Sequence, residues 1–201
     1  VGPDGATHQG LEDIALTRVL PNLTVVVPCD YHETRKATLA AAKTKKPIYI
    51  RFTRNKTAII TTKRAPFKIG RAEIFKPGQD VTICATGPLV YDSLIIAKKL
   101  EREGISVEVI NNHTIKPLDK KTIINSVKKT GCIVTVEEHQ INAGAGGAVL
   151  ECLAENYPVP AVRVGMPDAF GESGPPKELV EKYGLCCEGI ENAVKKVIKR
   201  K

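Results

Sequence analysis

The sequence predicts an α/β protein in which helices cover both faces of a mostly parallel sheet. Between residues 81 and 198, short apolar runs typical of buried strands alternate with amphipathic helical stretches, which favours this three-layer α/β/α fold. The polar, basic stretch TTKRAPFKIG, interrupted by Pro66, separates this region from a shorter one. We therefore expect two parts, residues 1–62 and 71–201, joined by a linker at 63–70.

The first part contains one strand–helix–strand unit. An apolar, β-branched run at 23–27 predicts a buried strand, and 48–52 predicts a second. Between them, Asp30 with Glu33 three residues later forms a capping box, which predicts a helix that ends near Lys43. Because a parallel sheet needs both faces covered, these three elements are expected to be the back half of a larger α/β domain.

The second part carries enough elements for a domain of its own. Its predicted strands lie at 81–85, 107–110, 132–136 and 161–164, with an edge strand, parallel or antiparallel, at 71–75. Its predicted helices lie at 89–103, 119–129, 147–155, 177–183 and 188–198.

Composition narrows the classes of function. No apolar run approaches the roughly 18 residues that a membrane span needs. The formal net charge is +8, but aromatic residues make up only 4 % and no nucleic-acid-binding motif occurs. The charge favours solvated helix faces and a solvated tail, with a positive field for anionic metabolites such as sugar phosphates as the alternative.

The six cysteines predict a reduced, cytoplasmic protein. None forms a C-x-x-C pair, and no Cys/His cluster has zinc spacing. Cys84 and Cys132 fall inside apolar runs, where a free cysteine behaves as a small hydrophobic residue.

Two positions stand out as candidates for chemistry. His8 lies beside Asp4 in a loop rich in glycine, where it is either a proton shuttle or hydrogen-bond donor to a substrate, or a surface histidine. Arg54 follows a predicted strand, at the sheet edge where ligands of parallel α/β folds bind. An arginine there either grips a phosphate through two charge-assisted hydrogen bonds or forms a surface ion pair.

Two further motifs have structural explanations that we favour. The run Gly144 to Gly147 before a helix invites a dinucleotide-binding interpretation, but the expected loop 137–143 is too long for that turn. Close helix packing is preferred, with an anion site at the helix N-terminus as an alternative. The cluster Glu137, Glu138 and His139 is either a metal or catalytic cluster or, as we prefer, polar packing between domains or subunits.

Together these motifs resemble the transketolase family over essentially the whole chain. The stretch DGATHQG with LEDIALTRVLPNLTVVVPCD is similar to the pyrimidine-binding domain. The stretches TIKPLD, VTVEEH, GGAVLE and FGESG are similar to the C-terminal domain, and FGESG resembles the C-terminal subunit of split prokaryotic transketolases. Synthases of 1-deoxyxylulose 5-phosphate usually have a second histidine where Gln9 stands, and 2-oxoacid dehydrogenase beta subunits lack the T-H-Q form.

The resemblance implies a role for four residues. The family's acid and histidine that contact the sugar map to Asp4 and His8, and His8 is the implied catalytic residue. The family's serine–arginine pair that binds the substrate phosphate maps to Thr53 and Arg54, with threonine in place of serine.

The resemblance also implies partners and cofactors. Thiamine diphosphate and Mg²⁺ would serve the complete enzyme, a pentose phosphate pathway transketolase that transfers a two-carbon ketol unit between sugar phosphates. No residue here maps to the cofactor or metal ligands, so none is expected bound to this chain alone. The expected partners are an N-terminal transketolase portion and a second copy of the chain in a homo-oligomer, a dimer as in the family. The competing hypothesis is a non-catalytic dimerisation or regulatory domain of such an enzyme, for example of the deoxyxylulose phosphate synthase or of a dehydrogenase beta subunit.

Overall fold

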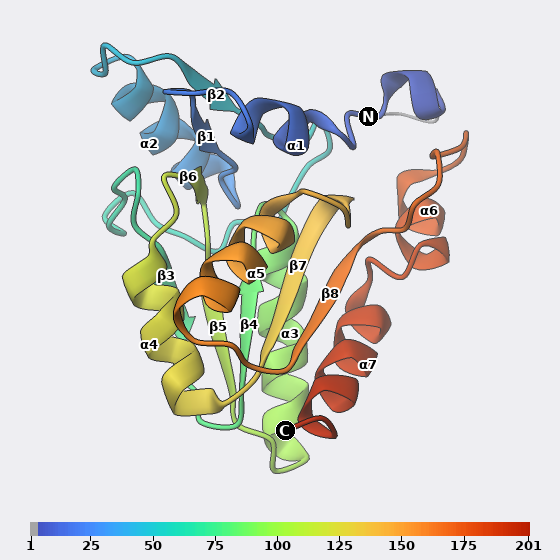
Figure 1. Cartoon of the computed structure of the whole chain (residues 1–201). Helices are drawn as coiled ribbons and strands as arrows, with labels where there is room; N and C mark the ends of the chain where they lie inside the picture. Colours follow the sequence, from blue (N-terminus) through green and yellow to red (C-terminus); the bar gives the residue numbers. More distant parts are fainter. Residues whose placement is uncertain (1–3) are drawn as a thin grey trace.

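The computed structural model describes residues 4–201, and most of them surround one five-stranded sheet (Figure 1). The strand order is β3-β5-β4-β7-β8. All neighbouring strands are parallel except β3, which pairs antiparallel with β5 and forms the predicted edge strand. The bounds of the strands are β3 Glu73–Lys76, β4 Val81–Ala85, β5 Val107–Asn111, β7 Ile133–Gln140 and β8 Ala161–Met166.

Helices cover both faces of this sheet, as predicted. On one face, apolar side chains of α3 (Leu89–Arg102) and α7 (Cys187–Ile198) pack against β4, β5 and β7. On the other, α4 (Lys120–Thr130) and α5 (Ala145–Asn156) pack against side chains that the same strands turn the opposite way. The three-layer α/β/α fold is therefore confirmed.

A second, smaller sheet joins the two parts of the chain. Its order is β2-β1-β6, from β1 (Thr24–Val26), β2 (Ile48–Ile50) and β6 (Thr114–Lys116). The parallel β1–β2 pair with α2 (Tyr31–Ala41) between its strands confirms the predicted strand–helix–strand unit. The antiparallel strand β6 was not predicted, and it comes from the second part, so one edge of β1 is covered by a distant segment.

Three shorter elements lie around the junction of the two parts. The 3-10 turn η1 (Ala6–His8) and the helix α1 (Asp13–Arg18) precede β1, and α6 (Pro176–Lys182) precedes α7. The sequence patterns had not predicted η1 and α1. In Figure 1, α1 lies across the top of the large sheet, and α6 stands near the N-terminal segment.

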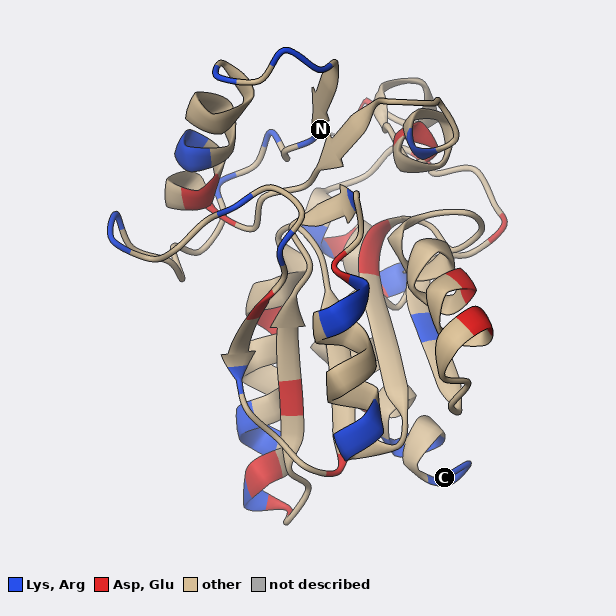
Figure 2. Cartoon of the chain, turned by 60° about the vertical axis from the view of Figure 1, so that its left-hand side comes forward, with Lys and Arg blue, Asp and Glu red and all other residues tan. Residues whose placement is uncertain are grey.

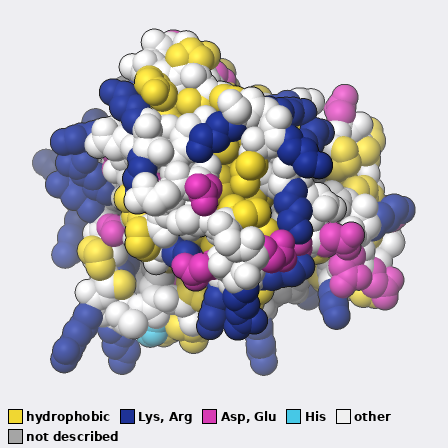
Figure 3. All heavy atoms as spheres, turned by 90° about the horizontal axis from the view of Figure 1, so that it is seen from below, with side chains coloured by type: hydrophobic (Ala, Val, Ile, Leu, Met, Phe, Trp, Pro, Cys, Tyr) yellow, Lys and Arg dark blue, Asp and Glu magenta, His cyan; other side chains and the backbone are white. Residues whose placement is uncertain are grey.

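Charged residues lie mostly on helices and loops, while the strands of the large sheet are mostly uncharged (Figure 2). Seen from below, Lys and Arg side chains project from the periphery of the molecule with acidic side chains between them (Figure 3). This distribution is consistent with the predicted solvated faces. Within residues 4–201, no helix is long and apolar enough to cross a membrane.

Candidate functional site

The structure brings together two of the predicted site residues that lie fifty positions apart. The Arg54 guanidinium, just beyond β2, lies 3.5 Å from the Asp4 carboxylate, Nη1 to Oδ2. Both side chains reach solvent, with 68 % of Arg54 and 45 % of Asp4 exposed. Thr53 precedes Arg54, and its hydroxyl accepts a hydrogen bond from the Asn55 N–H at 3.3 Å. A pair this exposed contributes little to folding, so both groups can exchange partners with a ligand.

His8 occupies a different position. It ends η1, and its Nδ1 lies 3.0 Å from the Thr7 hydroxyl, both on the exposed side of the loop. The residues that follow it, Gln9 and Gly10, line the pocket beside Arg54, whereas His8 does not. The structure therefore places His8 next to the pocket rather than inside it.

This pocket has a volume of about 250 Å³ and lies between the two parts of the chain. Its polar wall comes from the first part and from β7, and includes Asp13, Arg51, Thr53, Arg54 and Glu138. Its apolar wall comes from the second part: Met166 ends β8, and Leu179, Val180 and Tyr183 belong to or follow α6. A polar and charged wall opposite an apolar wall is the general form of a small-molecule site.

Arg51 is a site residue that the sequence analysis missed. Its Nη2 donates to the Gly10 carbonyl at 2.9 Å, and its Nε lies 3.0 Å from the Asp13 carboxylate. Tyr49, two residues earlier on β2, donates its hydroxyl to Asp13 at 2.8 Å. Burial, together with the bond to Asp13, raises the pKa of Tyr49. These contacts join the segment that follows His8 to the end of β2, which precedes Arg54.

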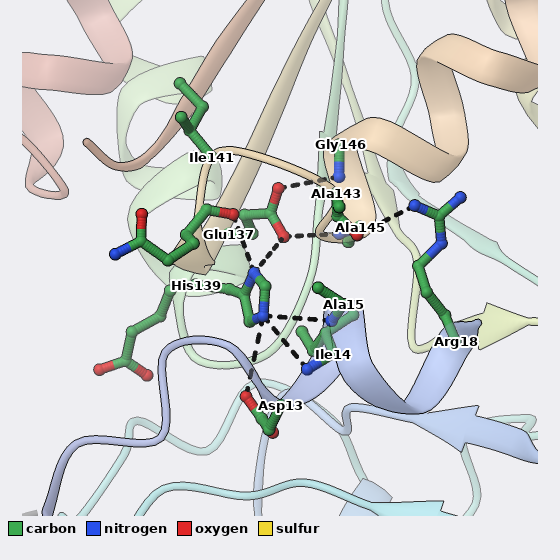
Figure 4. Close-up of polar contacts among 12 residues, drawn as sticks. Asp13, Ile14, Ala15, Arg18, Glu137, His139, Ile141, Ala143, Ala145 and Gly146 are labelled. Carbon is green, nitrogen blue, oxygen red and sulfur yellow. Dashed lines mark hydrogen bonds and ion pairs between the residues drawn. The ribbon is translucent and has the colours of Figure 1, made fainter. Parts of the chain in front are cut away.

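Below this wall, His139 and Glu137 form a buried polar cluster (Figure 4). The His139 Nε2 accepts hydrogen bonds from the backbone N–H groups of Ile14 and Ala15, at 3.1 and 3.3 Å. Its Nδ1 donates to the Gln140 carbonyl at 2.8 Å, so the ring is neutral. Burial lowers the pKa of His139, which favours the same neutral form.

Glu137 binds the N-terminus of α5. Its two carboxylate oxygens accept the N–H groups of Ala145 at 2.6 Å and Gly146 at 2.9 Å. Burial raises the pKa of Glu137 to about 7, and these two hydrogen bonds only partly oppose the rise. A Cβ on Gly144 would overlap the Glu137 carboxylate, and one on Gly146 would lie 2.5 Å from the Thr135 hydroxyl.

The glycine run therefore serves close packing, as we preferred, and the anion at this helix N-terminus is the protein's own Glu137. The loop in the structure is shorter than the loop expected at 137–143. The strand β7 continues to Gln140, and α5 begins at Ala145. Of the alternatives for Glu137 and His139, the contacts support polar packing between the two parts of the chain.

Among residues 4–201, no group of three or more His, Cys, Asp or Glu side chains could hold a metal ion. Arg51, the less exposed of the two pocket arginines, is already neutralised by Asp13. The cysteines lie apart from the pocket and are all free thiols, and burial raises the pKa of Cys84 to about 12.

Fold and pocket together define a class: a two-part α/β protein with an anion-compatible pocket where its parts meet. Two family descriptions match the chain, "Transketolase, pyrimidine binding domain" over residues 1–59 and "Transketolase, C-terminal domain" over residues 70–190. The chain thus belongs to the transketolase family, which is thiamine-diphosphate-dependent.

Individual relatives agree with this assignment. A 6-deoxy-6-sulfo-D-fructose transketolase subunit from Clostridium sp. (strain MSTE9) is 40 % identical over 198 residues, covering 98 % of this chain and 62 % of the relative. A 1-deoxy-D-xylulose-5-phosphate synthase from Desulfotalea psychrophila is 38 % identical over 197 residues, covering 94 % of this chain and 30 % of the relative.

A solved structure shares the fold. The structure titled "Split gene transketolase, inactive beta4 tetramer" has a TM-score of 0.94 and 44 % identity, covering 97 % of this chain and 64 % of that one. The chain thus spans less than two thirds of the length of these relatives.

Proposed function

We propose that this chain is the sugar-phosphate-binding part of a transketolase, which transfers a two-carbon ketol unit between sugar phosphates. The observation that carries the proposal is the meeting of Arg54, which lines the pocket, with Asp4, from a segment fifty residues away. Arg54 would exchange Asp4 for the substrate phosphate, because guanidinium and phosphate form two parallel charge-assisted hydrogen bonds. The displaced Asp4 carboxylate would then accept a hydrogen bond from a sugar hydroxyl.

The other residues have supporting roles in this proposal. Thr53 offers its hydroxyl to the phosphate beside Arg54. His8, next to the pocket, hydrogen-bonds the sugar near the reacting carbon and is the catalytic residue of this chain. The apolar wall from α6 excludes water from the carbon skeleton of the sugar. Thiamine diphosphate and Mg²⁺ are assigned to an N-terminal portion of the enzyme, which is the partner of this chain.

The further features of the proposal follow from the family. The complete enzyme would act in the pentose phosphate pathway, in the cytoplasm, as a homo-oligomer such as a dimer in which the N-terminal portion completes each site. The residues 1–62 would be the C-terminal half of a pyrimidine-binding domain, 63–70 a linker and 71–201 a C-terminal domain. The strand β6 would then tie these domains together through β1.

A reconstitution assay tests this function. The chain would be mixed with the N-terminal portion, thiamine diphosphate and Mg²⁺, and ketol transfer from xylulose 5-phosphate to ribose 5-phosphate would be followed. Activity that appears only in the full mixture would support the proposal. A folded, partner-bound chain without activity would contradict it and favour a non-catalytic assembly domain.

The relatives favour one second candidate, a part of a 1-deoxyxylulose-5-phosphate synthase. That reaction decarboxylates pyruvate, so the same mixture would be given pyruvate and glyceraldehyde 3-phosphate in place of the two sugar phosphates. Carbon dioxide release without ketol transfer would replace the first proposal by the second.

A further inference from the structure

The FGESG segment, Phe170–Gly174 of the second part, contacts the loop that carries Asp4 and His8. The Gln9 side chain donates a hydrogen bond from Nε2 to the Glu172 carbonyl at 3.0 Å, across 163 positions of sequence. Beside it, Gly5 adopts a φ of +88°, and a Cβ there would lie 2.8 Å from the Ser173 hydroxyl. One hydrogen bond and one close approach of the backbone therefore place the loop against the segment.

Gly171 makes the closest of these approaches. A Cβ at this position would overlap the Gln9 side-chain amide, well under the 3.0 Å that real Cβ atoms keep. The three atoms nearest to that Cβ all belong to Gln9. A methyl group at Gly171 would thus displace one side chain, and it is the side chain that binds Glu172.

The segment is tied to the second part just before it begins. The Gln140 side chain of β7 donates to the Ala169 carbonyl at 2.9 Å. Within the segment, the Glu172 carboxylate pairs with Lys182 of α6, but both side chains are about half exposed, so this pair contributes little. The support of the segment therefore comes from the large sheet.

Gln9 also lines the pocket. Its backbone N–H bonds to the Ala6 carbonyl at 3.2 Å, and that of His8 bonds to Gly5 at 3.0 Å. The loop is thus a compact turn that carries His8 and Gln9 together. The bond from the Gln9 side chain to Glu172 ties this turn to the second part, beside the pocket that Gln9 and Arg54 both line.

We propose that Gly171 and Glu172 are positioning residues of the sugar-phosphate pocket, acting through Gln9 on the loop that carries Asp4 and His8. The effect of these residues on catalysis rests on the proposed function, whereas their contact with the loop does not. The C-terminal domain would then contribute to substrate binding without contacting the substrate. Its FGESG segment would set the distance between the loop that binds the sugar and Arg54, which binds the phosphate.

A double-mutant cycle tests the coupling on the chain itself. Hydrogen exchange of residues 4–11 would be measured for wild type, Gly171→Ala, Gln9→Ala and the double variant. Gly171→Ala is expected to speed exchange in this segment about tenfold in the wild-type background and to change it less than twofold in the Gln9→Ala background. The matched control is Glu172→Gln, which removes the Lys182 partner but keeps the carbonyl, and should leave residues 4–11 unchanged.

A kinetic measurement on the reconstituted enzyme tests whether this coupling affects catalysis. Gly171→Ala should lower kcat/KM for the sugar phosphate about tenfold in the wild-type background and less than twofold in the Gln9→Ala background, because the displaced loop carries both Asp4 and His8 and the effect passes through Gln9. Equal effects of Gly171→Ala in both backgrounds, in exchange or in kcat/KM, would overturn the inference. An inactive wild-type mixture would count against the proposed function alone, since the exchange experiment decides the coupling without any activity.

Discussion

The imidazole of His139 accepts a hydrogen bond from the backbone N–H of Ile14 at 3.1 Å, across 125 positions of sequence. His139 stands on β7 of the large sheet, and Ile14 lies in the first turn of α1. The N-terminal N–H groups of a helix have no partner within the helix, and here Glu12 at the N-cap position supplies none from its side chain. A histidine from the second part therefore caps a helix of the first.

Replacing this cap should loosen the junction between the two parts. We predict that His139→Leu lowers the free energy of unfolding by about 1–3 kcal/mol, because two buried N–H groups lose their acceptor. Urea denaturation would measure the loss. The control is His32→Leu on α2, a partly exposed histidine outside the cluster. Equal stability of wild type and His139→Leu would show that the contact contributes nothing.

Glu137 should make the stability of the chain depend on pH. Burial raises its folded pKa to about 7, above the ordinary glutamate pKa of 4.5, so the stability of the fold is greater where this group is protonated. This contribution is complete below pH 4.5 and is lost as the pH rises to about 7. We predict that the stability of wild type relative to Glu137→Gln falls by on the order of 3 kcal/mol across that range.

Urea denaturation at a series of pH values would test this prediction. Glutamine keeps one oxygen that can accept from α5 but carries no titrating proton. The matched control is Glu155→Gln, at an exposed position of the same helix, whose curve should run parallel to wild type. Parallel curves for Glu137→Gln as well would contradict the raised pKa.

The helices that were predicted most accurately are those whose N-cap residue lies directly before them in the sequence. Asp30 and Asp119 accept N–H groups of the helices that they begin, at Glu33 and Thr122, so local pattern and structure agree at α2 and α4. The helix α1 was missed because its cap, His139, comes from another part of the chain. The strand β6 has only three residues, and its partner β1 is equally remote in sequence. Tertiary contacts stabilise both, and no local pattern records them.

The same distinction applies to the site. Asp4, Thr53 and Arg54 belong to recognisable motifs, and the structure brings Asp4 to Arg54. Arg51 was overlooked because its partners, Asp13 and the Gly10 carbonyl, become visible only when β2 is placed beside the loop. The apolar wall from α6 was equally invisible, because its residues resemble ordinary core positions.

His8 should matter for catalysis and not for folding. It is exposed, and the side chain that it contacts within the described residues 4–201 is that of the neighbouring Thr7. We predict that His8→Ala lowers kcat/KM of the reconstituted enzyme about 10- to 100-fold, as expected when one charge-assisted contact to a substrate is lost. Steady-state kinetics would measure this change, with His32→Ala as the matched histidine control. Wild-type kinetics for His8→Ala would identify it as a surface histidine.

Arg54 should discriminate between substrates by their phosphate. Among residues 4–201, the exposed Asp4 carboxylate is the partner that its guanidinium meets, so Arg54 can exchange it for a ligand. We predict that Arg54→Ala lowers kcat/KM about 10- to 100-fold for phosphorylated sugars and far less for unphosphorylated ones. Arg54→Lys should recover only part of this loss, because an ammonium group keeps the charge but not the two parallel hydrogen bonds. Arg64→Ala, which removes an exposed positive charge outside the pocket, controls for the general field of the protein. Equal losses for both kinds of sugar would reject the phosphate role, since a residue that merely supports the loop would affect them alike.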